Sequence, residues 1–564
     1  MMFVLLLLNG GVAYQLVRSS WHRLTVLLLL MMSSYSMFYL CNSLAGHMGY
    51  LFHSNITTIS TFSFSGDMIF DTMSLSFSWV VTMISFCVFL FARYYMAQDL
   101  HYYRFMWLLF LFVLSMNVLI FSGSLFILLV GWDGLGVSSF LLIIYYQSYT
   151  SLEAGVLTLM INRVGDILIM SLLFYLSIAG FSYIMYYPTT EMYIMLSLLT
   201  LAAMTKSAQY PFSVWLPAAM AAPTPVSALV HSSTLVTAGI YILIRAASTM
   251  PFPLDVNNLL LFTGAITSFI GGSCAVYEND LKKVIALSTL SQLGVMVFSL
   301  GLTAPTLALL HLYTHAMFKA LLFLVAGCIL MLAYGTQDMR LLGGVTQNNP
   351  LLLVFMNIST FCLMGLPFLS AFYSKHLILS VMWSSHINIF SCCIMLISVG
   401  LTSVYMIRML KSLNWTTNNS VILCSPFLVL LPYTPLVLLF VGSLFLGHFL
   451  SVSDMSYSFY NLFPFWCDLF LYSLLCFGVG SGLLIHKYKG SYMLTSMYYM
   501  DPVWKKSIYM YFPFSKTLKV LDYGWLEPYV YSVSLSKLST YLFKLYYLMH
   551  MGPNLKTALG VTVL

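Results

Sequence analysis

Charge is the scarcest component of this 564-residue sequence: Lys, Arg, Asp and Glu make up 7% of it, whereas 60% is hydrophobic. Charged residues make up roughly 25% of an ordinary soluble domain, so this composition excludes a water-soluble globular protein. The net charge of +7 is spread along the chain and forms no basic patch, which argues against a nucleic-acid partner. The sequence therefore predicts a polytopic membrane protein.

Motifs for metals and nucleotides are also missing. The ten cysteines occur singly apart from Cys392-Cys393, and no CxxC pair offers ligands for zinc or an iron-sulfur cluster. No GxGxxG motif follows a strand-like segment. Residues 1–18 are apolar but lack the basic start and the cleavage site of a signal peptide, so we interpret them as a first membrane span. We expect no cofactor and no metal in this chain.

Apolar runs close to the length of a membrane-spanning helix recur along the chain, and the loops between them are short. We therefore expect an all-α polytopic membrane protein with about fifteen transmembrane helices in one domain over residues 1–486. The runs lie at about 1–18, 24–44, 69–92, 105–121, 124–146, 163–187, 195–220, 226–247, 257–277, 284–302, 307–333, 351–375, 386–410, 426–449 and 467–485.

The segment 487–553 differs from the rest because eight lysines are interspersed with its tyrosines, leucines and prolines. This segment is too polar to cross a membrane. An amphipathic helix that lies along the membrane or along partner subunits fits the pattern. A disordered basic tail is the alternative, although its many bulky aromatic residues argue against it. Residues 554–564 would begin a shortened last helix.

Lys206 is the most informative single residue, because it lies in the apolar stretch Met195–Met220, which Pro211 and Pro217 then interrupt. A lysine at the centre of a membrane helix costs about 3 kcal/mol, so a lysine retained there faces a bundle interior or a water-filled cavity. A broken helix at that depth is tolerated under the same condition. The coincidence of these two features predicts an ion pathway.

Two carboxylates are candidate partners of this lysine. Asp133 lies in the middle of an apolar run and needs a positive partner unless it stays protonated, and Lys206 is the natural candidate. The pair would be functional or purely structural. Asp166 follows Arg163 at i,i+3, which indicates either a local ion pair at a helix end or a carboxylate that also tunes Lys206 and helps to admit protons.

His231 precedes Ser232, Ser233 and Thr234 and follows the proline-rich segment, so it is a candidate for a hydrated proton relay, since imidazole changes charge near neutral pH. A buried histidine that is simply hydrogen-bonded is the alternative.

His311, His315 and Lys319 are spaced i, i+4 and i+8, which places them along one stripe of a helix over roughly 12 Å. A third zinc ligand and an adjacent acid are missing, so the stripe predicts proton transfer along the membrane interior rather than metal binding. Lys375 is a second lysine beside a broken helix, since Pro367 interrupts the apolar run before it.

The motifs around these residues resemble those of the antiporter-like subunits of respiratory complex I, in the same order and over about residues 1–555. The resembling segments are residues 131–136 (GWDGLG), 162–166 (NRVGD), 206–209 (KSAQ), 215–217 (WLP), 223–234 (PTPVSALVHSST), 281–283 (LKK), 291–294 (SQLG), 315–320 (HAMFKA) and 372–375 (FYSK).

The resemblance implies two inverted five-helix repeats, roughly residues 105–247 and 257–410, and a lateral helix along the membrane arm. It also implies proton pumping driven by electron transfer in other subunits of an NADH:ubiquinone reductase. This chain would be a translocase subunit without redox chemistry of its own, and FMN, iron-sulfur clusters and ubiquinone would be bound elsewhere. Its partners would be the other membrane-arm subunits, above all the neighbouring antiporter-like subunit, and lipids such as cardiolipin in the mitochondrial inner membrane.

Carried over by position, the resemblance assigns each candidate residue a place in one relay. Asp133 and Lys206 would be the coupled pair with Asp166 beside them, His231, His311, His315 and Lys319 would form the central hydrated axis, and Lys375 would be the terminal proton carrier.

Three departures from the family pattern concern Asp133, His376 and the C-terminus. Much of the family has the longer Glu at Asp133, an acid often follows the lysine at His376, and the family has one more membrane helix after the lateral segment. Two rival functions are a cation/proton antiporter subunit, whose family shares the Lys206 and His231 motifs, and an inert assembly subunit.

Overall fold

The computed structural model describes residues 50–59, 62–179, 189–385, 388–416, 433–453, 465–484, 491–521 and 539–544. The chain divides into two compact units, Met1–Tyr498 and Tyr499–Leu564, and each is described by itself. The expected first two spans, residues 1–18 and 24–44, and the expected shortened last helix lie outside the described residues.

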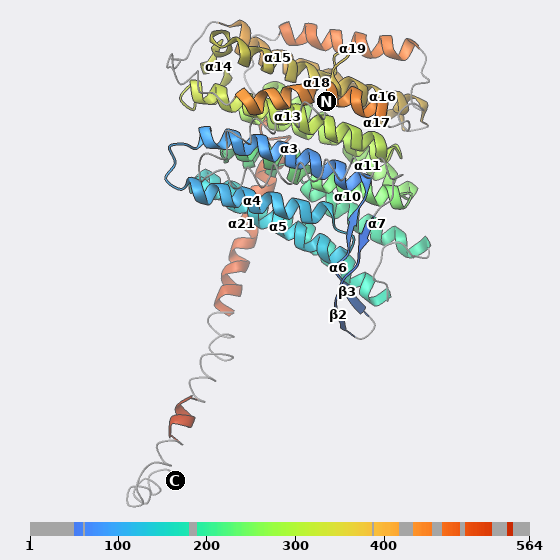
Figure 1. Cartoon of the computed structure of the whole chain (residues 1–564), viewed down its shortest axis with the longest axis vertical. Helices are drawn as coiled ribbons and strands as arrows, with labels where there is room; N and C mark the ends of the chain where they lie inside the picture. Colours follow the sequence, from blue (N-terminus) through green and yellow to red (C-terminus); the bar gives the residue numbers. More distant parts are fainter. Residues whose placement is uncertain are drawn as a thin grey trace, which may run out of the picture. The chain divides into compact units, whose positions relative to one another are not determined.

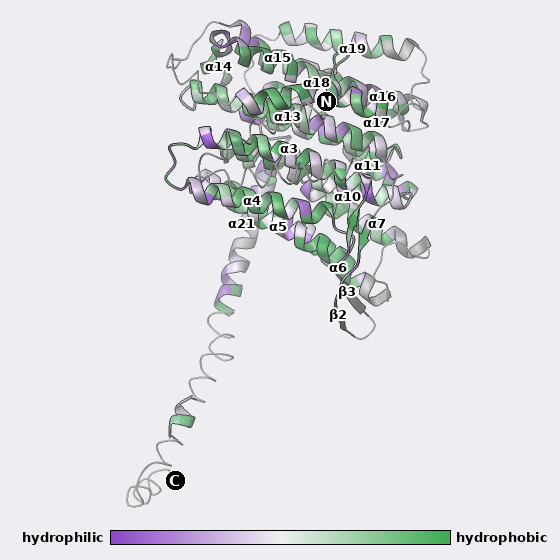
Figure 2. Cartoon of the chain, viewed as in Figure 1, coloured by the Kyte–Doolittle hydropathy of each residue, from purple (hydrophilic) through white to green (hydrophobic). Residues whose placement is uncertain are grey.

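The first unit is a bundle of apolar helices that run side by side (Figure 1), and hydrophobic residues cover most of their length (Figure 2). Helix α3, for example, packs on both α4 and α13. The helices are α3 (Thr72–Tyr95), α4 (Tyr102–Ile120), α5 (Leu125–Ile143), α6 (Tyr149–Ala179), α7 (Thr189–Lys206), α10 (Leu235–Thr249), α11 (Leu254–Tyr277), α12 (Leu281–Gly301), α13 (Pro305–Leu332), α15 (Pro350–Met364), α16 (Ser370–Ser384), α17 (Ile389–Leu410), α18 (Tyr433–Ser453) and α19 (Phe465–Leu484).

Within the described residues, ten helices are long and apolar enough to cross a membrane, and three shorter apolar helices accompany them. A helix suits this environment because it satisfies its backbone hydrogen bonds internally. The expected membrane class is therefore confirmed, whereas the count of about fifteen spans is not. Three bounds were also wrong: α6 begins at Tyr149, well before residue 163, the run 195–220 stops being one helix at Lys206, where α7 ends, and the run 351–375 is divided between α15 and α16.

Four short strands correct the all-α expectation. Strand β1 (Tyr50–Phe52) pairs antiparallel with β4 (Met68–Phe70), and β2 (Asn55–Ile59) pairs antiparallel with β3 (Phe62–Ser65), so one hairpin lies inside the other in sequence. The segment 55–65 is rich in Thr, Ile, Ser and Phe, a composition that favours strands over helices. A search for long apolar runs does not detect strands of three to five residues.

Two helices are broken where the sequence predicts breaks. Helix α7 ends at Lys206, and Ala208 then adopts a left-handed backbone conformation with φ of 53°. The chain continues through two short helices, α8 (Trp215–Ala218) and α9 (Thr224–Val226), and the π-helix η4 (Ser227–Thr234) into α10.

The second break separates α15 from α16. Gly365 follows the last residue of α15 and has a φ of 84°, a value that glycine adopts readily because it has no Cβ. Pro367 lies between the two helices, and Lys375 lies in the second turn of α16. Each break therefore has a lysine close to it.

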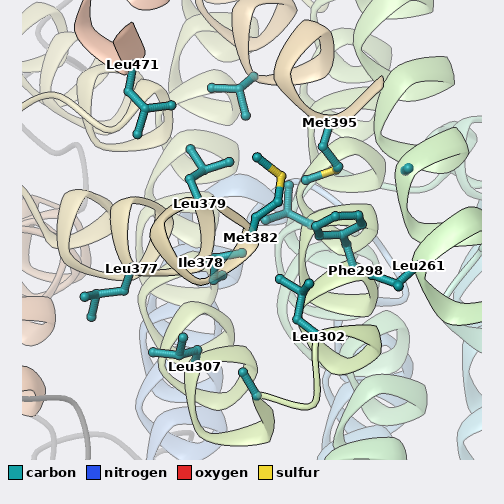
Figure 3. Close-up of a cluster of buried hydrophobic side chains, with 14 of the residues drawn as sticks. Leu261, Phe298, Leu302, Leu307, Leu377, Ile378, Leu379, Met382, Met395 and Leu471 are labelled. Atoms are coloured by element: carbon teal, nitrogen blue, oxygen red, sulfur yellow. The ribbon is translucent and has the colours of Figure 1, made fainter. Parts of the chain in front are cut away.

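A cluster of buried apolar side chains joins α11, α12, α13, α16, α17 and α19 (Figure 3). Phe298 of α12, Met382 of α16 and Met395 of α17 belong to it, and we call it the apolar cluster. Helices α11 and α12 also approach each other closely through Gly264 and Gly294. A Cβ on Gly294 would lie 2.7 Å from the Gly264 carbonyl oxygen.

In the second unit, helix α21 (Met500–Lys519) lies in the segment where the sequence predicts an amphipathic helix. Lys505 Nζ lies 3.4 Å from Asp501 Oδ2, an ion pair at i,i+4. The position of this helix along a membrane arm stays a prediction.

Candidate functional site: a buried series of lysines and histidines

Six of the eight candidate residues are buried in the helix bundle. Five of them are fully buried, and Lys375 has an exposed fraction of 4%. The five are Lys206 at the end of α7, His231 in η4, and His311, His315 and Lys319 in α13. Asp133 of α5 and Asp166 of α6 are half-buried. The bundle thus encloses the titratable groups that the sequence singles out.

Lys206 contacts α5 through Trp132, a residue that the sequence analysis did not select. Its ammonium group donates a hydrogen bond to the Trp132 carbonyl oxygen at 2.5 Å and lies 3.8 Å from the centroid of the indole ring. Trp132 Nε1 donates to Asp166 Oδ1 at 2.9 Å, and Arg163 donates to the other oxygen of Asp166 at 3.1 Å. Trp132 therefore connects Lys206 with Asp166.

This geometry bears on both carboxylate expectations. In the part of the chain that the structure describes, Asp133 forms no ion pair with Lys206, and its Oδ1 atom is buried without a hydrogen-bond partner. Asp166 instead reaches Lys206 through Trp132, which contacts both residues. Asp166 therefore makes a contact that fits each of the two interpretations: it forms a local ion pair with Arg163, and it is connected indirectly to Lys206.

His231 lies in the π-helix, where the wider turn occurs mostly as a local distortion at functional sites. Its ring packs edge-on against Trp215 with centroids 6.2 Å apart, and Trp215 Nε1 donates to the carbonyl oxygen of Thr205, next to Lys206. Among the residues that the structure describes, neither ring nitrogen of His231 has a hydrogen-bond partner. The second indole thus lies between the lysine region and the histidine.

The predicted stripe of His311, His315 and Lys319 lies on one helix, α13. The rings of His311 and His315 have centroids 6.4 Å apart, and Lys319 Nζ donates to Ser288 Oγ of α12 at 2.5 Å. His311 Nδ1 forms a hydrogen bond with Ser374 Oγ at 2.8 Å, whereas neither ring nitrogen of His315 has a partner in the described part of the chain. The stripe therefore runs from α12 at one end to α16 at the other.

Lys375 lies next to the second helix break. Its Nζ donates to the carbonyl oxygen of Leu363, one of the last carbonyls of α15, at 3.1 Å and to Thr402 Oγ1 of α17 at 3.2 Å. Helix ends leave such carbonyls without intrahelical partners, and an ammonium group is a favourable partner for them. Because Ser374 contacts His311 and precedes Lys375 in α16, the His311 end of the stripe lies next to Lys375.

Buried charge at two broken helices defines a class of protein, the antiporter-like membrane subunits. The fold is similar to the structure of the Mrp complex from Dietzia sp. DQ12-45-1b, with a TM-score of 0.73 and 22% identity over 92% of this chain and 60% of that chain. Residues 122–402 match the family model for the NADH:quinone oxidoreductase/Mrp antiporter transmembrane region. Residues 56–106 match the model for the N-terminus of chain 5 of NADH-ubiquinone oxidoreductase (complex I).

Among relatives, NADH-ubiquinone oxidoreductase chain 5 of Mytilus edulis is 38% identical over 518 residues, which cover 89% of this chain and 90% of the relative. The chain belongs to the NADH-ubiquinone oxidoreductase chain 5 family. The Anopheles gambiae member is 46% identical over 365 residues, 64% of this chain, and the match spans 63% of the relative's length. The family expected from the sequence motifs is confirmed.

Proposed function

We propose that this chain is a membrane-arm subunit of NADH:ubiquinone oxidoreductase and moves protons across the membrane through its buried Lys, His and Asp side chains. The observation that carries the proposal is the burial of six titratable side chains at the two helix breaks and along the α13 stripe between them. Ionisable residues inside a membrane protein are expensive and mark ion or proton pathways. An inert assembly subunit would gain nothing from them.

Water would complete the route between these side chains. Buried polar atoms almost always have a protein or water partner, yet the ring nitrogens of His231 and His315 have none among the described residues. Ordered water occupies buried sites where several polar groups can hold it. We therefore place water between Lys206 and His231 and between His315 and Lys319, which gives a route from Asp166 to Lys375.

Coupling would come from a change in the distance between Lys206 and its carboxylates. At an effective dielectric constant near 20, moving one carboxylate from about 4 to 8 Å removes roughly 2 kcal/mol of attraction. This is comparable to the roughly 2.3 kcal/mol needed to move one charge against 100 mV. A neighbouring subunit that shifts α5 or α6 would thus release the Lys206 proton toward His231.

The wider assignment follows from the family. Two inverted repeats, roughly residues 105–247 and 257–410, would each contribute one broken helix, and the segment 487–553 would form the lateral helix along the arm. The setting would be the mitochondrial inner membrane, with the neighbouring antiporter-like subunit and lipids such as cardiolipin as partners. FMN, iron-sulfur clusters and ubiquinone would be bound by other subunits, whose electron transfer drives this chain.

The test is Lys206→Ala in the assembled complex, reconstituted into vesicles, with protons moved per NADH oxidised as the readout. We expect this ratio to fall, since the first lysine of the route is lost. Lys283→Ala is the matched control, because the Lys283 side chain is 45% exposed and pairs with Asp280 at the start of α12. An unchanged ratio in an active Lys206→Ala complex would refute the proposal. Sodium-dependent proton exchange without NADH would instead support a cation/proton antiporter.

A further inference from the structure

A second set of buried polar side chains lies between Lys319 and Lys375 and contains no histidine. It consists of Ser288, Ser291 and Gln292 on α12 and Thr402 and Tyr405 on α17, and we call it the polar bridge. Each of these side chains has an exposed fraction of 2% or less. None of them was predicted from the sequence as a site residue.

Both ends of the polar bridge are hydrogen-bonded to the proposed proton carriers. Lys319 Nζ donates to Ser288 Oγ at 2.5 Å, and Lys375 Nζ donates to Thr402 Oγ1 at 3.2 Å. In the middle, the Tyr405 hydroxyl forms a hydrogen bond with Ser291 Oγ at 3.1 Å, which joins α12 to α17.

The helix spacing aligns these groups. Ser288 and Gln292 are four residues apart on α12, and Thr402 and Tyr405 are three apart on α17, so each pair shares one face of its helix. The polar bridge thus consists of one face of α12 and one face of α17, and the Tyr405 side chain joins the two helices.

The amide group of Gln292 can form more hydrogen bonds than the surrounding side chains provide. Its side chain is fully buried, and within the described residues neither the amide nitrogen nor the amide oxygen has a hydrogen-bond partner. An unsatisfied buried polar atom costs about 1–3 kcal/mol, so an apolar residue would stabilise the bundle better here. Gln292 follows Ser291, whose hydroxyl bonds the Tyr405 side chain that crosses to α17. An amide in this place suits the ordering of water between Ser288 and Tyr405.

We propose that the polar bridge is a second proton connection between Lys319 and Lys375, parallel to the connection through His315, His311 and Ser374. The inference rests on the proposed function. In each transfer the Tyr405 oxygen gains a proton from the Lys319 side as its own proton leaves toward Lys375. Only O–H and N–H bonds form and break, and the hydroxyl ends as it began.

The two connections differ in the charge that they hold. A proton resting on His315 places a second positive charge next to Lys319 on the same helix. A hydroxyl passes a proton on without storing it, because neither the phenoxide nor the doubly protonated oxonium form of tyrosine is stable at neutral pH. The polar bridge would therefore carry protons while Lys319 is charged.

The test compares Tyr405→Phe, His311→Asn and the double variant in the assembled complex, with the rate of NADH-driven proton uptake into vesicles as the readout. Phe keeps the ring and removes the hydroxyl, and Asn keeps a polar contact for Ser374 without a titratable group. We expect each single variant to keep at least half of the rate, and the double variant to lose at least tenfold. Tyr313→Phe is the control, since that buried hydroxyl bonds Ser76 outside the bridge.

Each outcome decides the proposal. A double variant no slower than His311→Asn alone would overturn the role of Tyr405, and a single variant that abolishes uptake would overturn the parallel arrangement. Ser291→Ala breaks the bridge from α12 and must match Tyr405→Phe, which separates a relay from a packing defect. Lys319→Ala removes both connections, so normal uptake in that variant would refute the proposed function itself rather than the bridge.

Discussion

Trp132 is a spacer between a cation and an anion. Its carbonyl oxygen and its ring face contact Lys206, and its indole N–H contacts Asp166. A direct pair would hold the lysine proton tightly, whereas an intervening indole leaves the attraction weaker and adjustable by small helix movements. The coupling of Lys206 thus depends on a residue without charge.

Two substitutions at Trp132 separate its contacts. Trp132→Phe keeps a ring face for the ammonium and removes the hydrogen bond to Asp166, and bonds to charged groups contribute about 1.5–3 kcal/mol. Trp132→Leu removes the ring face as well. We expect protons per NADH to fall in Trp132→Phe and further in Trp132→Leu, measured in reconstituted complex. Trp107→Phe is the control on an exposed position of α4, and equal ratios in all variants would contradict the spacer role.

At this scale the sequence predicts which residues are costly, but not what they contact. A buried lysine is recognisable because its charge is expensive anywhere in a membrane interior. Its partner depends on the direction in which a neighbouring helix presents its side chains. Asp133 and Trp132 are adjacent in sequence and point about 100° apart around α5. The sequence therefore predicted Asp133 as the partner of Lys206, whereas Trp132 makes the contact. A Trp next to an intramembrane acid was the available signal.

Close contact with α11 positions α12, the helix that carries three of the five residues of the polar bridge. A Cβ on Gly264 would lie 2.6 Å from the Phe298 amide nitrogen, and one on Gly294 would lie 2.6 Å from that of Ser268. Small residues allow membrane helices to approach closely, since no hydrophobic driving force acts between them in lipid. Helix α12 is therefore held by backbone contact rather than by large side chains.

Gly294→Val introduces a side chain where no space exists, and overpacking typically costs about 1–3 kcal/mol. We expect less assembled complex and a lower thermal midpoint of the remainder, measured on native gels and by a thermal shift. Gly480→Val is the matched substitution on α19, where a Cβ meets no atom within 4 Å. The close approach would be unimportant if both variants assembled equally.

Elements were predictable where one physical signal dominates. Length and hydropathy locate α11, α12 and α13 to within a few residues, because each crosses an apolar slab and each end is polar. The same signal misplaces the start of α6, whose first turns contain Ser151 and Glu153, and it misses β2 and β3. Both breaks were foreseen, since proline cannot continue a helix without losing a hydrogen bond.

In the bundle as a whole, the apolar cluster borders the polar residues and extends away from them along the helices: Leu377 and Val295 lie within three residues of Lys375 and Gln292. Phe298, Met395 and Met382 each lie seven residues along their helices from Ser291, Thr402 and Lys375, which is about 10 Å at 1.5 Å per residue. Figure 3 shows Phe298, Met382 and Met395 converging with leucines from neighbouring helices. Lys375 and the polar bridge thus have a mainly apolar region on one side.

Met395→Gln would make this level polar at nearly constant volume. We expect a passive proton permeability that is at least several-fold higher in vesicles without NADH, because an amide in the apolar cluster can hold water. Ile397→Gln on the exposed side of α17 is the control. A permeability equal in both variants and the unaltered protein would show that the apolar cluster is not a barrier.

The apolar cluster also determines where the membrane voltage acts. An electric potential falls mainly across material of low dielectric constant, and hydrated polar side chains transmit it with little loss. A proton on Lys375 would then experience almost the same voltage as one on Lys319, although different helices hold them. Nearly all of the electrical work, roughly 2.3 kcal/mol per charge at 100 mV, would be concentrated in crossing about two turns of helix.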